Sequence, residues 1–148
     1  MLSEGHVVGF HSMDHQNAMV RGYLHTRKDF RTGSEFMKRK GISDIWYRPP
    51  WGLTNLFSWH FVRKYGMKMV LWDVMAEDWE RGATAGSIRK KCLSRVKDGS
   101  ILCLHDGGRR TGGAPGAPEK TLEALTYVIP ALKEAGCRFI LPSEAVFR

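Results

Sequence analysis

Short apolar runs that alternate with helix-like segments are the feature that most constrains the fold of this 148-residue chain. The five runs are HVVGF (6–10), DIWYR (44–48), MKMVLWDV (67–74), SILCL (100–104) and CRFIL (137–141). Helical patterning is found at 30–41, 53–66, 84–99 and 118–136. This order predicts an α/β fold with about five parallel strands and flanking helices, arranged as an open doubly wound sheet or as part of a (β/α) barrel.

Capping residues and turn residues mark the ends of the predicted elements. Thr54 or Asn55 can cap the helix at 53–66, and Gly66 can end it. The segment between the first run and the first helix is polar and is expected to be a loop. Pro49 and Pro50 end the predicted strand at 44–48, because neither can donate a backbone hydrogen bond to a sheet.

The basic composition restricts the partners of the chain. Twenty-three Lys and Arg against fifteen Asp and Glu give a net charge of +8. These residues are scattered and no nucleic-acid-binding motif accompanies them, so we expect no nucleic-acid partner. No stretch is long and apolar enough to cross a bilayer, so no transmembrane segment is expected. The three cysteines form neither a CxxC motif nor a paired framework, which disfavours a zinc knuckle or a disulfide scaffold.

Chemically versatile side chains follow the predicted strands, where both α/β architectures build their sites. They are His11 and His15, Arg48 to Gly52, Asp73 and Asp78, and His105 with Asp106. Two imidazoles four residues apart can bind one metal ion, or they can face water on a loop. His105 can transfer protons near neutral pH or cap a turn. Arg48, ahead of two prolines, can clamp a carboxylate or lie on a surface turn.

The order of five segments resembles that of the polysaccharide deacetylases of carbohydrate esterase family 4. These segments are EGHVVGFHSMDH, YRPPWG, LWDVMAEDW, GSILCLHDG and TLEAL…IPALKEAGCRF. The resemblance runs over essentially the whole chain. It implies one polysaccharide deacetylase domain over residues 1–148, with the fold of a partial (β/α) barrel.

The resemblance implies a metal site and a reaction. In that family an H[S/T]xxH motif supplies two metal ligands, which match His11 and His15. The implied cofactor is a divalent metal, Zn²⁺ first, with Co²⁺ or Ni²⁺ as alternatives. The implied reaction removes N-acetyl groups from a polysaccharide or oligosaccharide that contains N-acetylglucosamine, such as chitin or peptidoglycan. Family habit implies a secreted or cell-envelope location, although MLSEGHVVGF lacks the pattern of a signal peptide.

Four further residues match the other motifs of the family. Arg48 and Trp51 match an RPP[Y/W]G motif that supplies an arginine for holding the catalytic base and a backbone N–H for the oxyanion. Asp78 matches an aspartate expected to orient that arginine. His105 matches the general acid of an LxH motif. The resemblance therefore implies that Arg48, Trp51, Asp78 and His105 are catalytic.

Two departures from the family pattern leave alternatives open. Cys103 stands where the LxH motif has leucine, which implies a wider acetyl pocket. The TFDDG-type motif, which supplies the catalytic base and a third metal ligand in the family, has no equivalent in the chain. The chain is therefore either the C-terminal portion of an amide-cleaving hydrolase or an inactive, truncated relative with a partial metal site. An incomplete barrel also predicts an exposed strand edge and a homo-oligomer that covers it.

Overall fold

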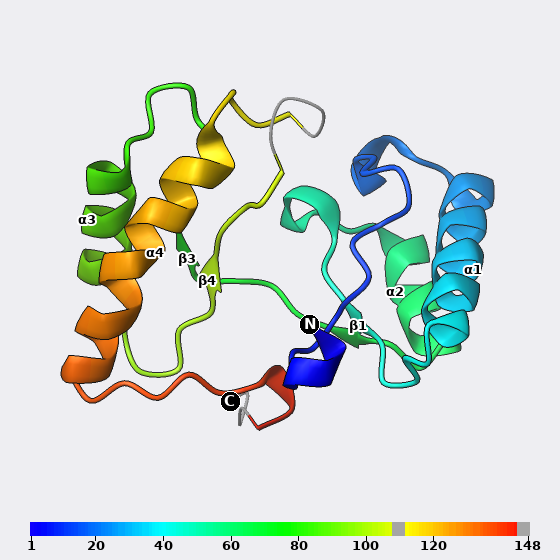
Figure 1. The fold of residues 1–148 in the computed structure, drawn as a ribbon. Helices are drawn as coiled ribbons and strands as arrows, with labels where there is room; N and C mark the ends of the chain where they lie inside the picture. The colour runs from blue at the N-terminus through cyan, green and yellow to red at the C-terminus, as the bar shows by residue number, and fades with distance from the viewer. Residues whose placement is uncertain (108–111, 145–148) are drawn as a thin grey trace. The chain divides into compact units, whose positions relative to one another are not determined.

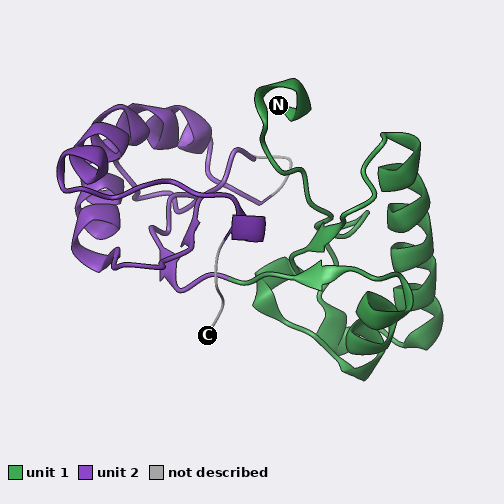
Figure 2. Ribbon diagram, turned by 90° about the horizontal axis from the view of Figure 1, so that it is seen from below, with its two compact units in different colours: residues 1–71 green, residues 72–148 purple. Residues whose placement is uncertain are grey.

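The computed structural model describes residues 1–107 and 112–144. The chain divides into two compact units, Met1–Leu71 and Trp72–Arg148 (Figure 2). Each unit combines parallel strand pairing with two α-helices (Figure 1). The units are considered one at a time, and the expectation of a single domain stays a prediction.

Unit 1 holds the first two α-helices and two short parallel strands. Its elements are α1 (Tyr23–Arg39), β1 (Trp46–Tyr47), α2 (Leu56–Lys64) and β2 (Lys68–Met69), with 3₁₀ turns at Leu2–Glu4, Ala18–Val20 and Pro50–Gly52. Trp46 pairs with Lys68 in the sheet, and Phe10 forms a parallel bridge to Tyr47 on the other side of β1. Three segments far apart in sequence therefore lie side by side.

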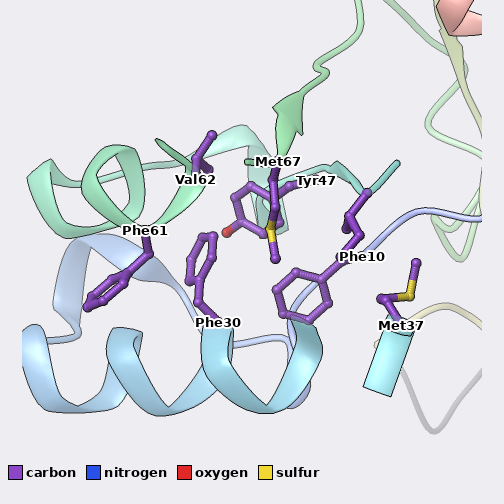
Figure 3. Close-up of a cluster of buried hydrophobic side chains, with 8 residues drawn as sticks. Phe10, Phe30, Met37, Tyr47, Phe61, Val62 and Met67 are labelled. Carbon is purple, nitrogen blue, oxygen red and sulfur yellow. The ribbon is translucent and has the colours of Figure 1, made fainter. Parts of the chain in front are cut away.

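The core of unit 1 is aromatic (Figure 3). Phe30 of α1 lies with its ring centroid 4.7 Å from Tyr47 and 5.8 Å from Phe10. Gly33, one turn further along α1, makes room for Phe10, because a Cβ at Gly33 would lie 2.3 Å from the Phe10 ring. The core thereby fixes the end of the segment from which His11 emerges.

Unit 2 repeats this plan with smaller side chains. Its elements are β3 (Val74–Met75), α3 (Ala85–Arg95), β4 (Leu102–Cys103), α4 (Ala117–Glu134) and a 3₁₀ turn at Pro142–Glu144. Val74 pairs in parallel with Leu102. The Asp73 carboxylate accepts from the Ile101 N–H at 2.6 Å and from the Ser100 hydroxyl at 3.0 Å, which ties the starts of both strands together.

The four predicted helices and their parallel α/β context are confirmed. Asn55 caps α2 in a capping box with Ser58, as one of the two expected caps. α1 begins at Tyr23, inside the segment predicted as a loop, since its first turns carry too few apolar residues to reveal a helix. Gly66 ends the α2 segment with a φ of 61°.

The strand predictions fare less well than the helix predictions. The run at 67–74 is divided between β2 and β3, which belong to different units, and 137–141 forms no strand. The described residues form two two-stranded sheets and not a five-stranded barrel. Hydrophobicity alone overestimated these strands because Phe139 and Ile140 are apolar but exposed. No helix in the described part of the chain is long and apolar enough to span a membrane.

Candidate active-site residues

His11 and His15 lie on one loop of unit 1 with their rings facing each other. The ring centroids are 5.0 Å apart and the ring planes are inclined by 71°. The His11 Nδ1–H donates to the Arg48 carbonyl at 2.6 Å, which orients the ring. A hydrogen bond from one ring nitrogen to a backbone carbonyl is the usual way in which a metal-ligating histidine is oriented for binding through the other nitrogen.

The loop that carries both histidines is held by Asp29 of α1. The Asp29 carboxylate accepts from the Met13 N–H at 2.7 Å and from the Ser12 hydroxyl at 3.2 Å. Ser12 and His15 both have positive φ, 65° and 51°, so the loop is a constrained turn. Burial raises the pKa of Asp29 more than these hydrogen bonds lower it. Sequence reasoning missed Asp29 because it lies in the segment predicted to be a loop.

The two imidazoles are candidate ligands for part of a metal site. Imidazole nitrogens bind Zn²⁺ at about 2.0–2.1 Å, and catalytic zinc sites use three protein ligands and one open position. The facing rings and the carbonyl-bound Nδ1 of His11 fit such a role for two ligands. Within residues 1–107 and 112–144, no three His, Cys, Asp or Glu side chains gather as potential ligands. A third ligand would therefore have to come from outside this set.

Arg48 and Trp51 lie beside the histidine loop in unit 1. The Arg48 N–H donates to the Phe10 carbonyl at 2.9 Å, and its guanidinium donates to the Leu71 carbonyl at 3.2 Å. Trp51 is 56% exposed, with its ring centroid 4.5 Å from that of His15. The Trp51 φ of 53° shows that the turn after two buried prolines is tight. Unit 1 thus brings together four of the predicted site residues.

Asp78 and His105 form a hydrogen-bonded pair in unit 2. The Asp78 Oδ1 atom lies 2.8 Å from His105 Nδ1, and its Oδ2 accepts from the His105 backbone N–H at 2.7 Å. The Asp78 side chain is fully buried, whereas that of His105 is 39% exposed. Because an ionised carboxylate only accepts, Nδ1 carries the ring proton and Nε2 is the atom that can exchange a proton with a substrate.

Thr121 of α4 completes the environment of Asp78. Its hydroxyl donates to Asp78 Oδ2 at 2.9 Å. Burial raises the pKa of Asp78, but the hydrogen bonds from His105 and Thr121 outweigh this effect and leave the pKa lowered. The Asp78 carboxylate is therefore held ionised beside the imidazole. No motif points to Thr121, since its contact with Asp78 joins residues 43 positions apart in the sequence.

Asp78 has further contacts inside unit 2. The resemblance implies that Asp78 orients Arg48, which stays a prediction, and within unit 2 its carboxylate accepts hydrogen bonds from His105 and Thr121. The buried carboxylate accepts from three donors, which are the His105 ring Nδ1, the His105 backbone N–H and the Thr121 hydroxyl. The Trp79 ring packs edge-on against His105 with centroids 4.7 Å apart. Asp78 and Trp79 therefore set the orientation of His105.

Comparison with known proteins identifies relatives of the whole chain. No family model matches it. A peptidoglycan-N-acetylglucosamine deacetylase of Bacillus cereus is 30% identical over 146 residues, which cover 97% of this chain and 65% of the relative. A chitooligosaccharide deacetylase of Azorhizobium caulinodans is 30% identical over 140 residues, covering 90% of this chain and 66% of the relative. The chain thus spans slightly less than two thirds of these relatives.

Solved structures of deacetylases and esterases have a fold similar to that of this chain. A peptidoglycan N-acetylglucosamine deacetylase in complex with a hydroxybenzamide compound superimposes with a TM-score of 0.85 at 27% identity, covering 97% of this chain and 64% of that one. An acetyl xylan esterase of family 4 from Clostridium thermocellum, in complex with cobalt, gives 0.79 at 27% identity, covering 97% and 65%. In fold the chain is similar to carbohydrate esterases of family 4. The chain is a homologue of the polysaccharide deacetylases, carbohydrate esterase family 4, and corresponds to part of their length.

Proposed function

We propose that the chain is part of a metal-dependent deacetylase acting on a polysaccharide or oligosaccharide that contains N-acetylglucosamine. The observation that carries the proposal is the buried Asp78 carboxylate bound to a half-exposed His105. This arrangement suits a general acid, because the carboxylate fixes the orientation of the ring and leaves Nε2 directed away from Asp78. The homologues named as N-acetylglucosamine deacetylases supply the substrate class.

Unit 1 would supply the metal ligands. His11 and His15 would hold a divalent ion, Zn²⁺ first and Co²⁺ or Ni²⁺ as alternatives, together with a third ligand. Such an ion acts as a Lewis acid toward a carbonyl oxygen. The hydrogen bond from His11 Nδ1 to the Arg48 carbonyl supports this assignment, since it fixes the ring before any ion binds.

The remaining residues would act on charge and protons during amide cleavage. Arg48 would hold the carboxylate of the catalytic base in its ionised form, and the Trp51 N–H would stabilise the developing oxyanion. His105 would donate the Nε2 proton to the departing amine of the sugar, while Asp78 keeps the imidazole in place. The catalytic base itself is not one of the residues assigned here.

One observation favours an alternative, an inactive relative with a partial metal site. The described residues contain no cluster of three potential ligands, so the two histidines alone would bind an ion weakly. This alternative predicts metal binding without turnover. It concerns the same residues and differs only in whether amide cleavage follows.

Deacetylation of a chitin oligosaccharide by the zinc-loaded protein separates the two proposals. We expect turnover in the wild type, and a loss of about 10²–10⁴-fold in kcat for His105→Asn because the general acid is removed. His60→Asn, on an exposed position of α2, is the matched control and is expected to retain wild-type turnover. Absence of turnover in the wild type, with zinc bound, would favour the inactive alternative.

A further inference from the structure

Glu77 occupies a strained position directly before Asp78, where the chain leaves β3. Its φ of 49° lies in the left-handed region. A residue with a side chain adopts this conformation at a cost of about 1–2 kcal/mol, so it persists only where other contacts hold it. The next residue, Asp78, is fully buried beside His105. The backbone at Glu77 therefore sets the direction in which the Asp78 carboxylate enters the interior.

Two cationic side chains of α3 bind the Glu77 carboxylate. Lys91 Nζ lies 2.6 Å from Oε2, and Arg95 Nη1 lies 2.9 Å and 3.1 Å from the two carboxylate oxygens. Arg95 also donates to the carbonyl of Met75, the last residue of β3. The hydrogen bond from Lys91, followed by that from Arg95, lowers the pKa of Glu77. These contacts connect one face of α3 to the end of β3.

We propose that Glu77, held by Lys91 and Arg95, is a positioning residue for the Asp78–His105 pair. This inference rests on the proposed function, in which His105 is the general acid. Exposed ion pairs contribute little to overall stability, generally about 0–1 kcal/mol. Two cations on one carboxylate, at a strained residue adjacent to the buried Asp78 carboxylate, act instead on local geometry. A displacement of Asp78 by a fraction of an ångström weakens both of its hydrogen bonds to His105.

The His105 backbone amide reports this geometry directly, because it donates to Asp78 Oδ2 at 2.7 Å. Hydrogen exchange of that amide in the whole chain, followed by NMR, measures how often the contact opens. In Glu77→Gln, which keeps the size of the side chain and removes its charge, we expect exchange to accelerate about tenfold. Lys90→Gln on the same helix, outside the Glu77 contacts, is the matched control and is expected to leave the rate unchanged.

A second substitution separates the side-chain contacts from the backbone strain. Glu77→Gly relieves the left-handed strain and also removes the carboxylate. We expect faster exchange of the His105 amide in this variant as well, although its backbone at residue 77 is no longer strained. Wild-type exchange in both Glu77→Gln and Glu77→Gly would overturn the proposal. If neither variant folds, Lys91→Gln is measured instead; faster exchange is expected there, and a wild-type rate would again overturn it.

The ratio of the effects on kcat and KM distinguishes a positioning role of Glu77 from a purely structural one. With a chitin oligosaccharide as substrate, Glu77→Gln is expected to lower kcat about tenfold while KM changes less than about twofold. Equal effects on kcat and KM, or none, would argue against positioning. A wild-type chain without deacetylase activity would refute the proposed function, whereas the exchange rate of the His105 amide would still test whether Glu77 positions Asp78.

Discussion

The two units hold their candidate site residues in contrasting ways. In unit 1, His11 and His15 lie on a loop that is oriented by one backbone carbonyl and anchored through Asp29. In unit 2, Asp78 is buried and receives three hydrogen bonds, two of them from His105. The histidine loop is therefore held through contacts of its backbone and of a serine hydroxyl with Asp29, whereas Asp78 and His105 are joined to each other by two hydrogen bonds.

The pKa values of Asp29 and Asp78 are shifted in opposite directions. Burial raises the pKa of Asp29, whereas hydrogen bonds overcome burial and lower the pKa of Asp78. Asp29 therefore holds its loop at some electrostatic cost, and Asp78 is stabilised as an anion. Substitutions at the two positions should accordingly have different consequences for the stability of the protein.

The largest effect is expected for Asp78→Ala. This change leaves the His105 N–H and the Thr121 hydroxyl without their buried acceptor, so we expect a loss of about 2–4 kcal/mol in the free energy of unfolding. Urea denaturation measures it. Asp98→Ala, at an exposed position, is the control and should change stability by less than about 0.5 kcal/mol. Equal effects of the two substitutions would show that the buried, hydrogen-bonded Asp78 carboxylate does not stabilise unit 2.

Gly33→Ala tests the core beneath the histidine loop. The new methyl group would overlap the Phe10 ring, from which a Cβ would lie 2.3 Å away. We expect a loss of about 1–3 kcal/mol from overpacking, only partly offset by the higher helix propensity of alanine. Gly86→Ala in α3 is a matched helix control, because the nearest atom to its Cβ would be 3.8 Å away. A neutral Gly33→Ala would show that Phe10 moves freely.

Asp29→Ala should weaken the histidine loop more than the rest of unit 1. We expect a loss of about 1–2 kcal/mol in stability and a lower zinc affinity, since Ser12 and Met13 lose their acceptor. Asp29→Asn retains an acceptor and removes the buried charge, so it should retain most of the affinity. Denaturation and zinc titration distinguish the two variants. An unchanged affinity in Asp29→Ala would mean that the loop needs no anchor.

The smallest effect is a difference in pH dependence. For Asp78, stability is present above its usual pKa of 3.8 and is lost as the pH falls below that value, because the folded pKa is lower. For Asp29 the folded pKa is higher, so its contribution falls as the pH rises above 3.8. Denaturation of both variants at pH values above and below 3.8 measures this. In Asp78→Asn the free energy of unfolding should depend less on pH below 3.8, and in Asp29→Asn it should depend less on pH above 3.8. A weaker pH dependence on the same side of pH 3.8 in both variants would contradict the opposite pKa shifts of Asp78 and Asp29.

The helices of this fold were easier to predict than the strands, because helix ends are marked by neighbouring residues in the sequence. Asn55 and Thr84 cap α2 and α3 through capping boxes, so these helix starts are encoded within a few residues. The strands are only two residues long, and their pairing depends on partners 20 or more residues away. Apolar runs therefore located strand regions without defining their lengths. The strand predicted at 137–141 was wrong because no neighbouring residue distinguishes an exposed apolar segment from a strand paired in a sheet.

The candidate site was predictable where a motif carries the chemistry. His11, His15, Arg48, Trp51 and His105 were selected from motifs, and their roles stay predictions. The contacts of Asp78 with His105 and Thr121 were not predicted, because the side chains that a carboxylate contacts depend on tertiary structure. The contacts of Asp29, Glu77 and Thr121 span at most 17, 18 and 43 residues of sequence, which no local pattern reveals.

Zinc coordination in single variants tests the division between metal ligands and proton-transfer residues most directly. X-ray absorption of the zinc-loaded protein should show imidazole ligands at about 2.0–2.1 Å. We predict that His11→Ala loses this signal and that His105→Asn retains it while turnover falls. Equal loss of bound zinc in both variants, or retention in both, would contradict the account.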